Sequence, residues 1–416
     1  MKNIIRVHLP HIQENRIEYY YEVEGTWKEA FQLEKTFSVA YSMDISFVPP
    51  SVAVVPLLAN ILPIAWVYDA EIIVPSCDKD FYDCIEEVKQ GYRDMYPRMN
   101  FGGTLTVDQI EENPVKNQSG TCAFFSGGVD AFNTLTKHIS EKPTLITLWG
   151  ADVDLTDETG WNRVKEHLEE TCKEFELDYV MIKTGFRDFL HEGVLGAVVR
   201  ESGDGWWHGF QHGIGIISHA APIMYALGKK TVYFASSFTI ADKGRVTCAS
   251  DPSIDNYVRF CGCNIIHDGY EFNRQMKIHN ITQFTKKSGK RISLRVCWES
   301  MGGSNCCNCE KCWRTILGLY AECVSPEEYG FHYSSQQLAM IAKKMKSGRN
   351  PMFSSLRYQP IQNSMRRNIK KEDLPTQIQW FYSEDLKKYD KIKLYRRIWR
   401  RILHYARRLK GQKNEQ

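Results

Sequence analysis

Residues 121–130 read TCAFFSGGVD, and this stretch decides the fold that we predict for the chain. An apolar run of strand type, Thr121–Phe125, leads into a Ser-Gly-Gly turn, and a helical stretch follows. Two glycines let the backbone approach an anion closely and direct successive N–H groups toward it. The positive end of the helix dipole adds to this attraction. The segment therefore predicts a phosphate-binding loop made of Ser126, Gly127, Gly128, Val129 and Asp130.

Two residues of this loop have side chains suited to a nucleotide. Ser126 can donate its hydroxyl, and Asp130 can hold Mg²⁺ or fold back on the loop. The alternative is an ordinary strand-to-helix turn, because Ser-Gly-Gly is a common sequence. A Gly-Gly turn that follows the first strand of an α/β sheet and ends in Asp favours phosphate binding.

Downstream of the loop, short apolar segments alternate with helical ones, which indicates a parallel sheet covered on both faces. The predicted fold class is α/β with a doubly wound parallel sheet, in which ligands bind beyond the carboxyl ends of the strands. Trp149, at the end of the second strand, is also assigned to nucleotide binding. The further strands are expected at Thr144–Trp149, Tyr179–Ile182, Thr231–Ala235 and Asn264–His267, and the helices at Asp130–Ile139, Asp157–Phe175, Gly209–Leu227 and Tyr270–Ile278.

The regions on either side of this pattern are predicted to be separate domains. Residues 1–115 have the pattern of a small α+β domain, residues 116–325 carry the loop and the parallel sheet, and residues 326–416 are helical and basic. The polar segment Asn113–Gly120 marks the first boundary. In the first region, strands are expected at Ile17–Glu24, Ile45–Val48 and Glu71–Val74, and Asp78 is expected to cap a helix.

Composition and charge exclude several classes of protein. With 416 residues, 43% hydrophobic and 25% charged, the chain is of globular composition and is neither disordered, collagen-like nor a coiled coil. The apolar run Val52–Tyr68 is interrupted by Pro56, Asn60 and Pro63 and is too short to span a membrane, so we expect a buried helix and loop. The N-terminus becomes polar too soon for a secretory signal, and we expect a cytoplasmic protein.

The charges are unevenly distributed. Residues 341–416 hold 21 Lys and Arg against 6 Asp and Glu, whereas residues 1–340 hold 32 against 44. The tail Leu386–Leu409 has apolar residues near helical spacing between clusters of arginine. Such a basic amphipathic helix packs against its own chain, or binds a protein partner, nucleic acid or a membrane surface.

A cysteine cluster predicts a metal site. Cys297-x8-Cys306-x2-Cys309-x2-Cys312 offers four thiolates at the spacings that a closed, structural zinc site requires. Cys307 is left over, or competes with Cys306 for a place in the site. An iron–sulfur cluster also takes four cysteines and is the main alternative, and a set of buried free thiols is the other.

Several other residues are candidates for binding or catalysis. His208 is assigned to the nucleotide site, and His208 and His212, four apart on one helical face, could bind metal, although histidines at a helix start more often pack or cap. Arg274 and Lys277 share a helix face after the fifth strand and could meet the β and γ phosphates, unless that face is simply solvated. The remaining candidates, each with a structural alternative, are Asp251, Asp255, Asp268 and the pair Cys261 and Cys263.

The loop resembles the SGGxDS loop of the PP-loop ATP pyrophosphatases, or adenine nucleotide α-hydrolase-like enzymes, which have a HUP-like sheet. It lacks the Lys of the nucleoside-triphosphate loop and the third Gly of the dinucleotide fingerprint. Members of the resembled family cleave ATP between the α and β phosphates and adenylate a substrate oxygen, which a nitrogen or sulfur nucleophile then displaces. One departure is Ala131, which stands where the family has its final Ser.

The loop and the cysteines together are similar to 7-cyano-7-deazaguanine synthase and QueC-like proteins over about residues 121–322. The resemblance implies ATP, Mg²⁺ and Zn²⁺ as cofactors, with a small-molecule substrate and ammonia or another nitrogen donor. Asp130, Arg274 and Lys277 would be the catalytic residues. The segment from Ser236 to Asp255 departs from the synthase, so a different substrate is expected. The alternatives are tRNA thiolation, sugar amidation, or a non-catalytic nucleotide-binding component of a multiprotein system such as anti-phage defence, and self-association stays open.

Overall fold

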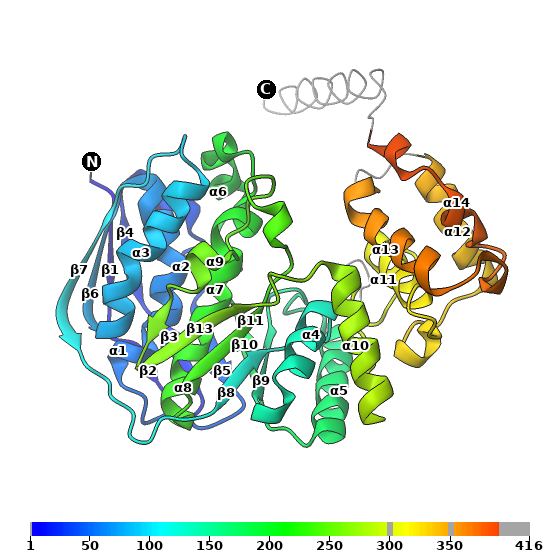
Figure 1. Ribbon diagram of the computed structural model, residues 1–416. Coiled ribbons are helices and arrows are strands. Elements are labelled where there is room, and N and C mark those ends of the chain that lie inside the picture. Colours follow the sequence, from blue (N-terminus) through cyan, green and yellow to red (C-terminus); the bar gives the residue numbers. More distant parts are fainter. Residues whose placement is uncertain (1, 298–302, 348–352, 391–416) are drawn as a thin grey trace. The chain divides into compact units, whose positions relative to one another are not determined.

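The computed structural model describes residues 2–297, 303–347 and 353–390 (Figure 1). The chain divides into two compact units, residues 1–304 and 305–416. The boundary that the sequence predicts near residue 115 lies inside the first unit, and the one near residue 325 lies inside the second. Each unit is described separately below.

A sheet of nine strands forms the centre of the first unit, and five of its strands are parallel neighbours. Their order across the sheet is β13-β11-β8-β9-β10. After β8 the chain adds β9 and β10 on one side of this strand, and it then adds β11 and β13 on the other side. The five strands are β8 (Thr121–Phe124), β9 (Thr144–Trp149), β10 (Tyr179–Thr184), β11 (Thr231–Ala235) and β13 (Cys263–Asp268). The predicted parallel strands are thus confirmed within one or two residues at each end.

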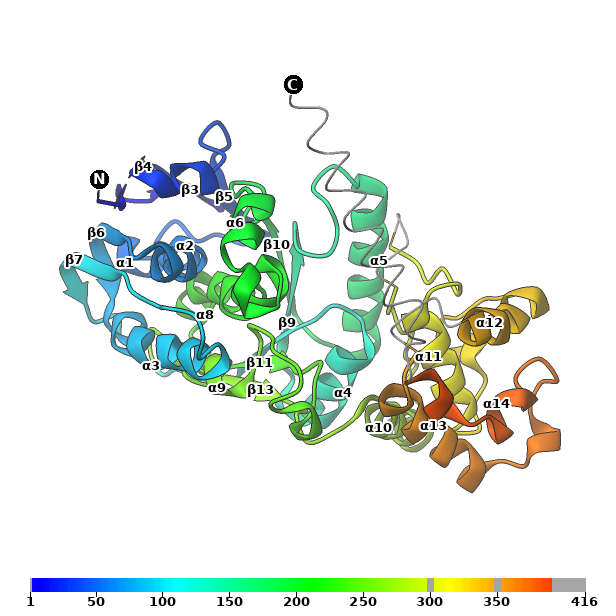
Figure 2. The same cartoon turned by 90° about the horizontal axis from the view of Figure 1, so that it is seen from above.

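Helices lie on both faces of this parallel region (Figures 1 and 2). One face carries α4 (Val129–Lys137), α5 (Glu158–Phe175) and α10 (Arg274–Ser288). The other carries α7 (His212–Ile217), α8 (Ala221–Leu227) and α9 (Pro252–Asp255). The molecule is a mixed α/β protein with parallel sheet strands, as the alternating pattern predicts.

Two of the predicted helices differ from the structure. The stretch Gly209–Leu227 is a π-helical turn followed by α7, a 3₁₀ turn and α8, because Pro222 has no N–H to continue the helix and starts a new one. The helix expected at Tyr270–Ile278 begins four residues later. The Asn273 side chain accepts a hydrogen bond from the Met276 N–H at 3.0 Å and caps the helix there.

The N-terminal residues contribute strands to two sheets. A four-stranded sheet has the order β4-β1-β6-β7, while β2, β3 and β5 extend the nine-stranded sheet beyond β10, where β5 pairs antiparallel. The expected strand Ile17–Glu24 is two strands, β3 and β4, one in each sheet. The bounds are β1 (Ile4–Val7), β2 (His11–Ile12), β3 (Arg16–Tyr19), β4 (Tyr21–Glu24), β5 (Phe37–Tyr41), β6 (Glu71–Asp78), β7 (Thr104–Glu111) and β12 (Arg259–Phe260).

Three further expectations for this region can be compared with the structure. The strand predicted at Ile45–Val48 is wrong: this segment is a turn closed by a hydrogen bond from the Val48 N–H to the Ile45 carbonyl at 3.1 Å. Its two apolar ends are buried in the core, which explains the strand-like pattern. The strand at Glu71–Val74 is confirmed as part of β6. The Asp78 cap is also confirmed, since its carboxylate accepts from the Phe81 N–H at the start of α3 (Lys79–Met95).

The apolar run near residue 60 is helical and buried, as expected. It forms α1 (Pro50–Ala53) and α2 (Val55–Tyr68), and almost every residue of α2 is buried. Among the residues that the structure describes, no helix is both long and apolar enough to cross a membrane.

The second unit is helical, as the sequence predicts. Its helices are α11 (Glu310–Tyr320), α12 (Ser335–Ser347), α13 (Ser355–Asn368) and α14 (Gln379–Ser383). Of the basic tail Leu386–Leu409, only the first residues are described, and Leu386–Tyr389 form a 3₁₀ turn. The predicted amphipathic helix beyond Asp390 lies outside the described residues.

A buried amide links the N-terminal helix α2 to α7. The Asn60 side chain donates to the carbonyls of Pro56 (2.9 Å) and Gly215 (3.2 Å) and accepts from Gln211 Nε2 at 2.8 Å. We expect Asn60→Ala to lower the free energy of unfolding by about 2–4 kcal/mol, because the buried Gln211 amide and a cavity remain. Urea denaturation would measure this, with the exposed Asn162→Ala on α5 as the control. An effect no larger than that of the control would contradict the prediction.

Candidate functional site

The predicted phosphate loop connects β8 to α4, as expected. Gly127 has φ +76°, and a Cβ there would come within 2.6 Å of the His167 ring. A side chain at position 127 would be strained by the left-handed backbone and would collide with His167, so the position requires glycine. Gly128 follows in an extended conformation as the N-cap of α4, which begins at Val129. The Ser126 side chain is exposed at the tip.

Two backbone N–H groups of the loop lie at the start of α4. Within the described part of the chain, the N–H groups of Gly127 and Gly128 donate no hydrogen bond. They lie at the N-terminus of α4, a helix of nine residues, where the dipole attracts negative charge. Free N–H groups combined with a helix start can bind a phosphate.

Two residues that the sequence does not predict support the loop from behind. The Arg295 N–H donates to the Gly127 carbonyl at 2.7 Å, and its guanidinium donates to the Ser126 carbonyl at 3.1 and 2.8 Å. His167 on α5 stacks on Phe125 and donates from Nε2 to the Ser293 carbonyl at 2.5 Å. Burial lowers the pKa of His167, and the nearby Arg295 charge adds to this. Neither residue belongs to a local motif, so no sequence signal could have found them.

The three predicted catalytic residues lie together. Lys277 on α10 is 2% exposed, and its ammonium donates to the Asp130 carboxylate at 2.9 Å and to the Ser236 carbonyl. Arg274, one turn earlier, lies 3.5 Å from the same carboxylate. Ser236 directly follows β11, and Lys277 lies on the helix that follows β13. The two contacts of the Lys277 ammonium therefore connect Asp130, after β8, with the ends of β11 and β13. Asp130 therefore faces two cations at the carboxyl edge of the sheet.

Asp268, at the carboxyl end of β13, holds α4 in place at the same end of the strands. Its carboxylate accepts from Thr134 (2.8 Å), Lys137 (2.7 Å) and His138 (3.2 Å), and so fixes α4 against the strand. Burial raises the pKa of Asp268, but these three hydrogen bonds outweigh burial and the pKa is lowered. The residue acts as a structural anchor in this geometry.

Trp149, assigned to the nucleotide, is buried. Its ring stacks on Trp161 with a centroid distance of 5.3 Å, and the Lys183 ammonium lies 4.2 Å from its centroid. Its indole N–H donates to the Asp154 carbonyl at 2.9 Å. These contacts hold the turn after β9, and the assignment to nucleotide binding stays a prediction.

His208 has a carboxylate partner that the sequence does not predict. Its Nδ1 lies 2.9 and 3.1 Å from the two carboxylate oxygens of Asp204. The Asp204 hydrogen bond, followed by one to Cys248, raises the pKa of His208 to about 10 despite partial burial. Within the described residues, no candidate metal group includes His208 or His212.

The pair Cys261 and Cys263 lies at the amino ends of the parallel strands, opposite the carboxyl ends where the loop lies. Cys263 begins β13, and the Gln118 amide donates to its sulfur at 2.9 Å. Both side chains are buried. Since the parallel strands start here and end at the loop, these cysteines are separated from the loop by the length of β13.

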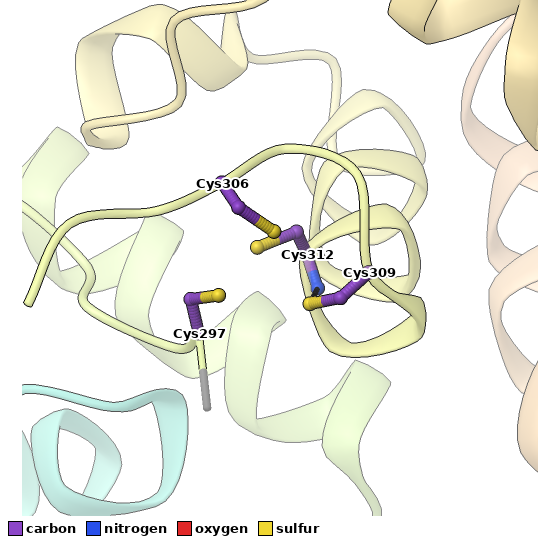
Figure 3. A group of neighbouring side chains, drawn as sticks. All are labelled: Cys297, Cys306, Cys309 and Cys312. Atoms are coloured by element: carbon purple, nitrogen blue, oxygen red, sulfur yellow. Dashed lines mark hydrogen bonds between the residues drawn. The ribbon is translucent and has the colours of Figure 1, made fainter. Parts of the chain in front are cut away.

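The four predicted metal ligands converge (Figure 3). The Sγ atoms of Cys297, Cys306, Cys309 and Cys312 all lie within 4.8 Å of one another. Four thiolates around one zinc ion at about 2.3 Å from each sulfur require separations of this order. In an iron–sulfur cluster the four cysteines are divided among two or four irons, which spreads the set of sulfurs farther apart. The group could therefore hold one metal ion such as zinc.

The local backbone explains which cysteines take part. The Asn308 N–H donates to Cys306 Sγ at 3.3 Å, and the Cys312 N–H donates to Cys309 Sγ at 3.5 Å, as Cys309 caps α11. Cys307 has φ +49° and stays out of the group, and its carbonyl accepts from the Trp313 indole at 2.9 Å. Cys306 is thus the member of the pair that joins the site.

No protein-family model matches the chain, and neither a curated protein nor a solved structure matches it. Its function is therefore inferred from the residues of the site.

Metal content tests the cysteine group. We expect purified protein to hold about one zinc per chain, and Cys309→Ala to lose the metal and several kcal/mol of stability, since structural zinc is coupled to folding. Elemental analysis and thermal unfolding would measure both effects. The control is Cys307→Ala, an adjacent buried cysteine outside the group, which should keep the metal. Equal metal loss in both variants, or iron in place of zinc, would contradict the assignment.

The His208–Asp204 pair makes a pH prediction. We expect the imidazole to keep its proton up to about pH 10, whereas an unfolded histidine loses it near 6.5. The stabilisation is therefore complete below about pH 6.5 and is lost as the pH rises through the folded pKa. Histidine NMR titration would follow the proton. Asp204→Asn should return the pKa toward 6.5, and the exposed Glu201→Gln should not; a wild-type midpoint near 6.5 would refute the pairing.

Proposed function

We propose that the protein is a PP-loop enzyme that cleaves ATP to AMP and pyrophosphate. The cleavage adenylates a carboxyl or amide-type oxygen of a small-molecule substrate. Ammonia or another nitrogen nucleophile then displaces AMP. This reaction resembles the one that QueC-like proteins carry out, with a different substrate.

One observation carries this proposal. The parallel strands have the order β13-β11-β8-β9-β10, with β9 and β10 on one side of β8 and with β11 and β13 on its other side. This order supports the proposal of a doubly wound sheet, whose switch point would lie between β8 and β11. Ligands of such sheets bind outside the carboxyl ends at this switch point. The Ser-Gly-Gly loop follows β8, Ser236 follows β11, and the Lys277–Asp130 pair lies between the two. The residues that the sequence singles out lie together at this end of the strands, and this proximity supports the proposal of a nucleotide site there.

Each residue has a role suited to ATP. The free N–H groups of Gly127 and Gly128 and the Ser126 hydroxyl would bind phosphate oxygens. Arg274 and Lys277 would offset charge that develops on the leaving pyrophosphate. In the structure these cations neutralise Asp130, and phosphates would compete for them.

Asp130 would hold Mg²⁺ once the phosphates engage the two cations. Magnesium is usually bound by one or two carboxylates plus substrate phosphates, and Asp130 supplies one carboxylate at the edge of the sheet. Such an ion neutralises polyphosphate charge. The cysteine group would hold zinc in a structural role, since four protein ligands leave no open position.

The fate of ATP tests the reaction class. Protein would be incubated with ATP, Mg²⁺, ammonium and a small-molecule cell extract, and nucleotides would be separated by chromatography. We expect AMP and pyrophosphate from the wild type and a loss of at least about 100-fold in Lys277→Met, because a charged group aimed at the phosphates disappears. The matched control is Lys287→Met at the exposed end of the same helix.

The other outcomes are distinguishable. ADP and phosphate would refute the PP-loop assignment. ATP binding without turnover would instead favour a nucleotide-binding component of a larger assembly. In that case Ala131, buried where the family has its final Ser, is the first position to restore.

A further inference from the structure

A polar cavity lies in the first unit where the neighbouring strands β10, β5 and β3 meet (Figure 1). Its volume is about 360 Å³, which is within the range of small-molecule sites. Lys183 and Gly185, at the carboxyl end of β10, line it together with Leu155, which follows β9. The N-terminal strands β3 and β5 contribute Arg16 and Ala40. None of its lining residues belongs to the phosphate loop or to the cysteine group.

The pairing of the strands places two cations on either side of a small residue. Ala40 of β5 lies opposite Lys183 of β10 and opposite Arg16 of β3. Directly opposite residues point to the same face of a sheet, so the two long cationic side chains flank Ala40 on one face. Because Ala40 has only a methyl group, space remains between them. On the other face of the same strands, Val39 and Ile182 are buried in the core.

Both of these cations are held by neighbouring groups. The Lys183 ammonium lies 4.2 Å from the centroid of the Trp149 ring. The Arg16 guanidinium donates to the Ser38 hydroxyl at 3.1 Å and pairs with the Glu18 carboxylate at 2.9 Å. A ligand therefore meets side chains that have already lost part of their rotational freedom, which lowers the entropic cost of binding.

The cavity carries an excess of positive charge. Arg16, Lys35 and Lys183 line it, and Asp188 is the carboxylate among the lining residues. Glu18 neutralises Arg16, whereas neither lysine ammonium has an ion pair or a hydrogen bond within the described part of the chain. The two lysines are therefore available to an anion.

The remaining lining residues fit an organic anion. The hydroxyl groups of Thr36 and Ser38 can donate to carboxylate or phosphate oxygens. Leu155 packs against the apolar cluster of Trp149 and Trp161, so it offers an apolar surface next to the cations. The cavity thus combines charge, hydroxyl donors and an apolar side.

We propose that this cavity binds a small organic anion, a carboxylate or a phosphate ester with an apolar body. Lys35 and Lys183 contact the anionic group, and Leu155 packs against the apolar body. The cavity and the phosphate loop lie at the same ends of the strands, and two strand spacings, about 10 Å, separate β10 from β8. The inference goes beyond the proposed function and does not depend on it.

Acetylation of lysines in the full-length protein tests the site without ATP. Acetic anhydride reacts with neutral amines, and peptide mass spectrometry gives the rate at each lysine. The probes are benzoate and phenyl phosphate, which share an apolar ring, and benzyl alcohol is the neutral control. A bound anion favours the protonated ammonium and covers it, so we expect at least one of the two anions to slow acetylation of Lys35 and Lys183 by about threefold or more. The exposed Lys173 on α5 should keep its rate.

The two anions distinguish the kinds of ligand. Stronger protection by benzoate assigns the cavity to carboxylates, and stronger protection by phenyl phosphate assigns it to phosphate esters. Unchanged rates at Lys35 and Lys183 with both anions would overturn the proposal. Equal slowing at Lys173 would also overturn it, because this would be an effect of ionic strength, and so would equal protection by benzyl alcohol, which carries no charge.

Variants of the cavity separate its charge from its shape. Lys183→Met keeps a long side chain and should weaken the protection of Lys35 by about tenfold, because one charge near the anion is lost. Ala40→Leu should weaken the protection by filling the hollow, and Asp188→Asn should strengthen it, which a misfolded protein could not do. Lys173→Met is the matched control. Unchanged protection in Lys183→Met would refute the site, whereas the separate ATP assay decides the proposed function.

Discussion

The carboxyl ends of β8, β11 and β13 have to meet at one edge of the sheet, because these strands are parallel neighbours. This constraint brings together residues far apart in the sequence. Asp130 follows β8, Ser236 follows β11, and Lys277 lies on the helix after β13, yet one ammonium contacts the first two. A buried cation is costly unless it is paired, so Lys277 and Asp130 depend on each other and fix α10 against α4.

The same edge has two chemically different sides. On the side of α4 and α10, the loop offers N–H groups and cations, which suit phosphates. On the side of α7 and α9, His208 pairs with the Asp204 carboxylate. The His208 ring contacts Phe238, whose carbonyl accepts from the Ser236 hydroxyl after β11. The cysteine group could hold a metal ion, and backbone N–H groups donate to two of its four sulfurs.

Local patterns were sufficient for much of the fold and of the site. The strand–helix alternation after residue 121 predicts the parallel strands, and the glycine loop, Arg274, Lys277 and the four cysteines are all recognisable from residue type and spacing. Patterns failed where burial came from tertiary contacts. Ile45 and Val48 are buried at the ends of a turn, and one apolar run near Tyr20 is shared between two sheets.

Residue types and short spacings were enough to identify candidates for binding a phosphate or a metal, because those properties depend on side-chain chemistry and on spacing within a few residues. Which of these residues share a site depends on the folded chain. Arg295 and His167 support the loop, and Asp204 pairs with His208. Each of these contacts joins segments that are not adjacent in one motif. These residues are close because of the order of the strands and because they lie at the same ends of neighbouring strands. The spacing of residues along the chain predicts neither feature.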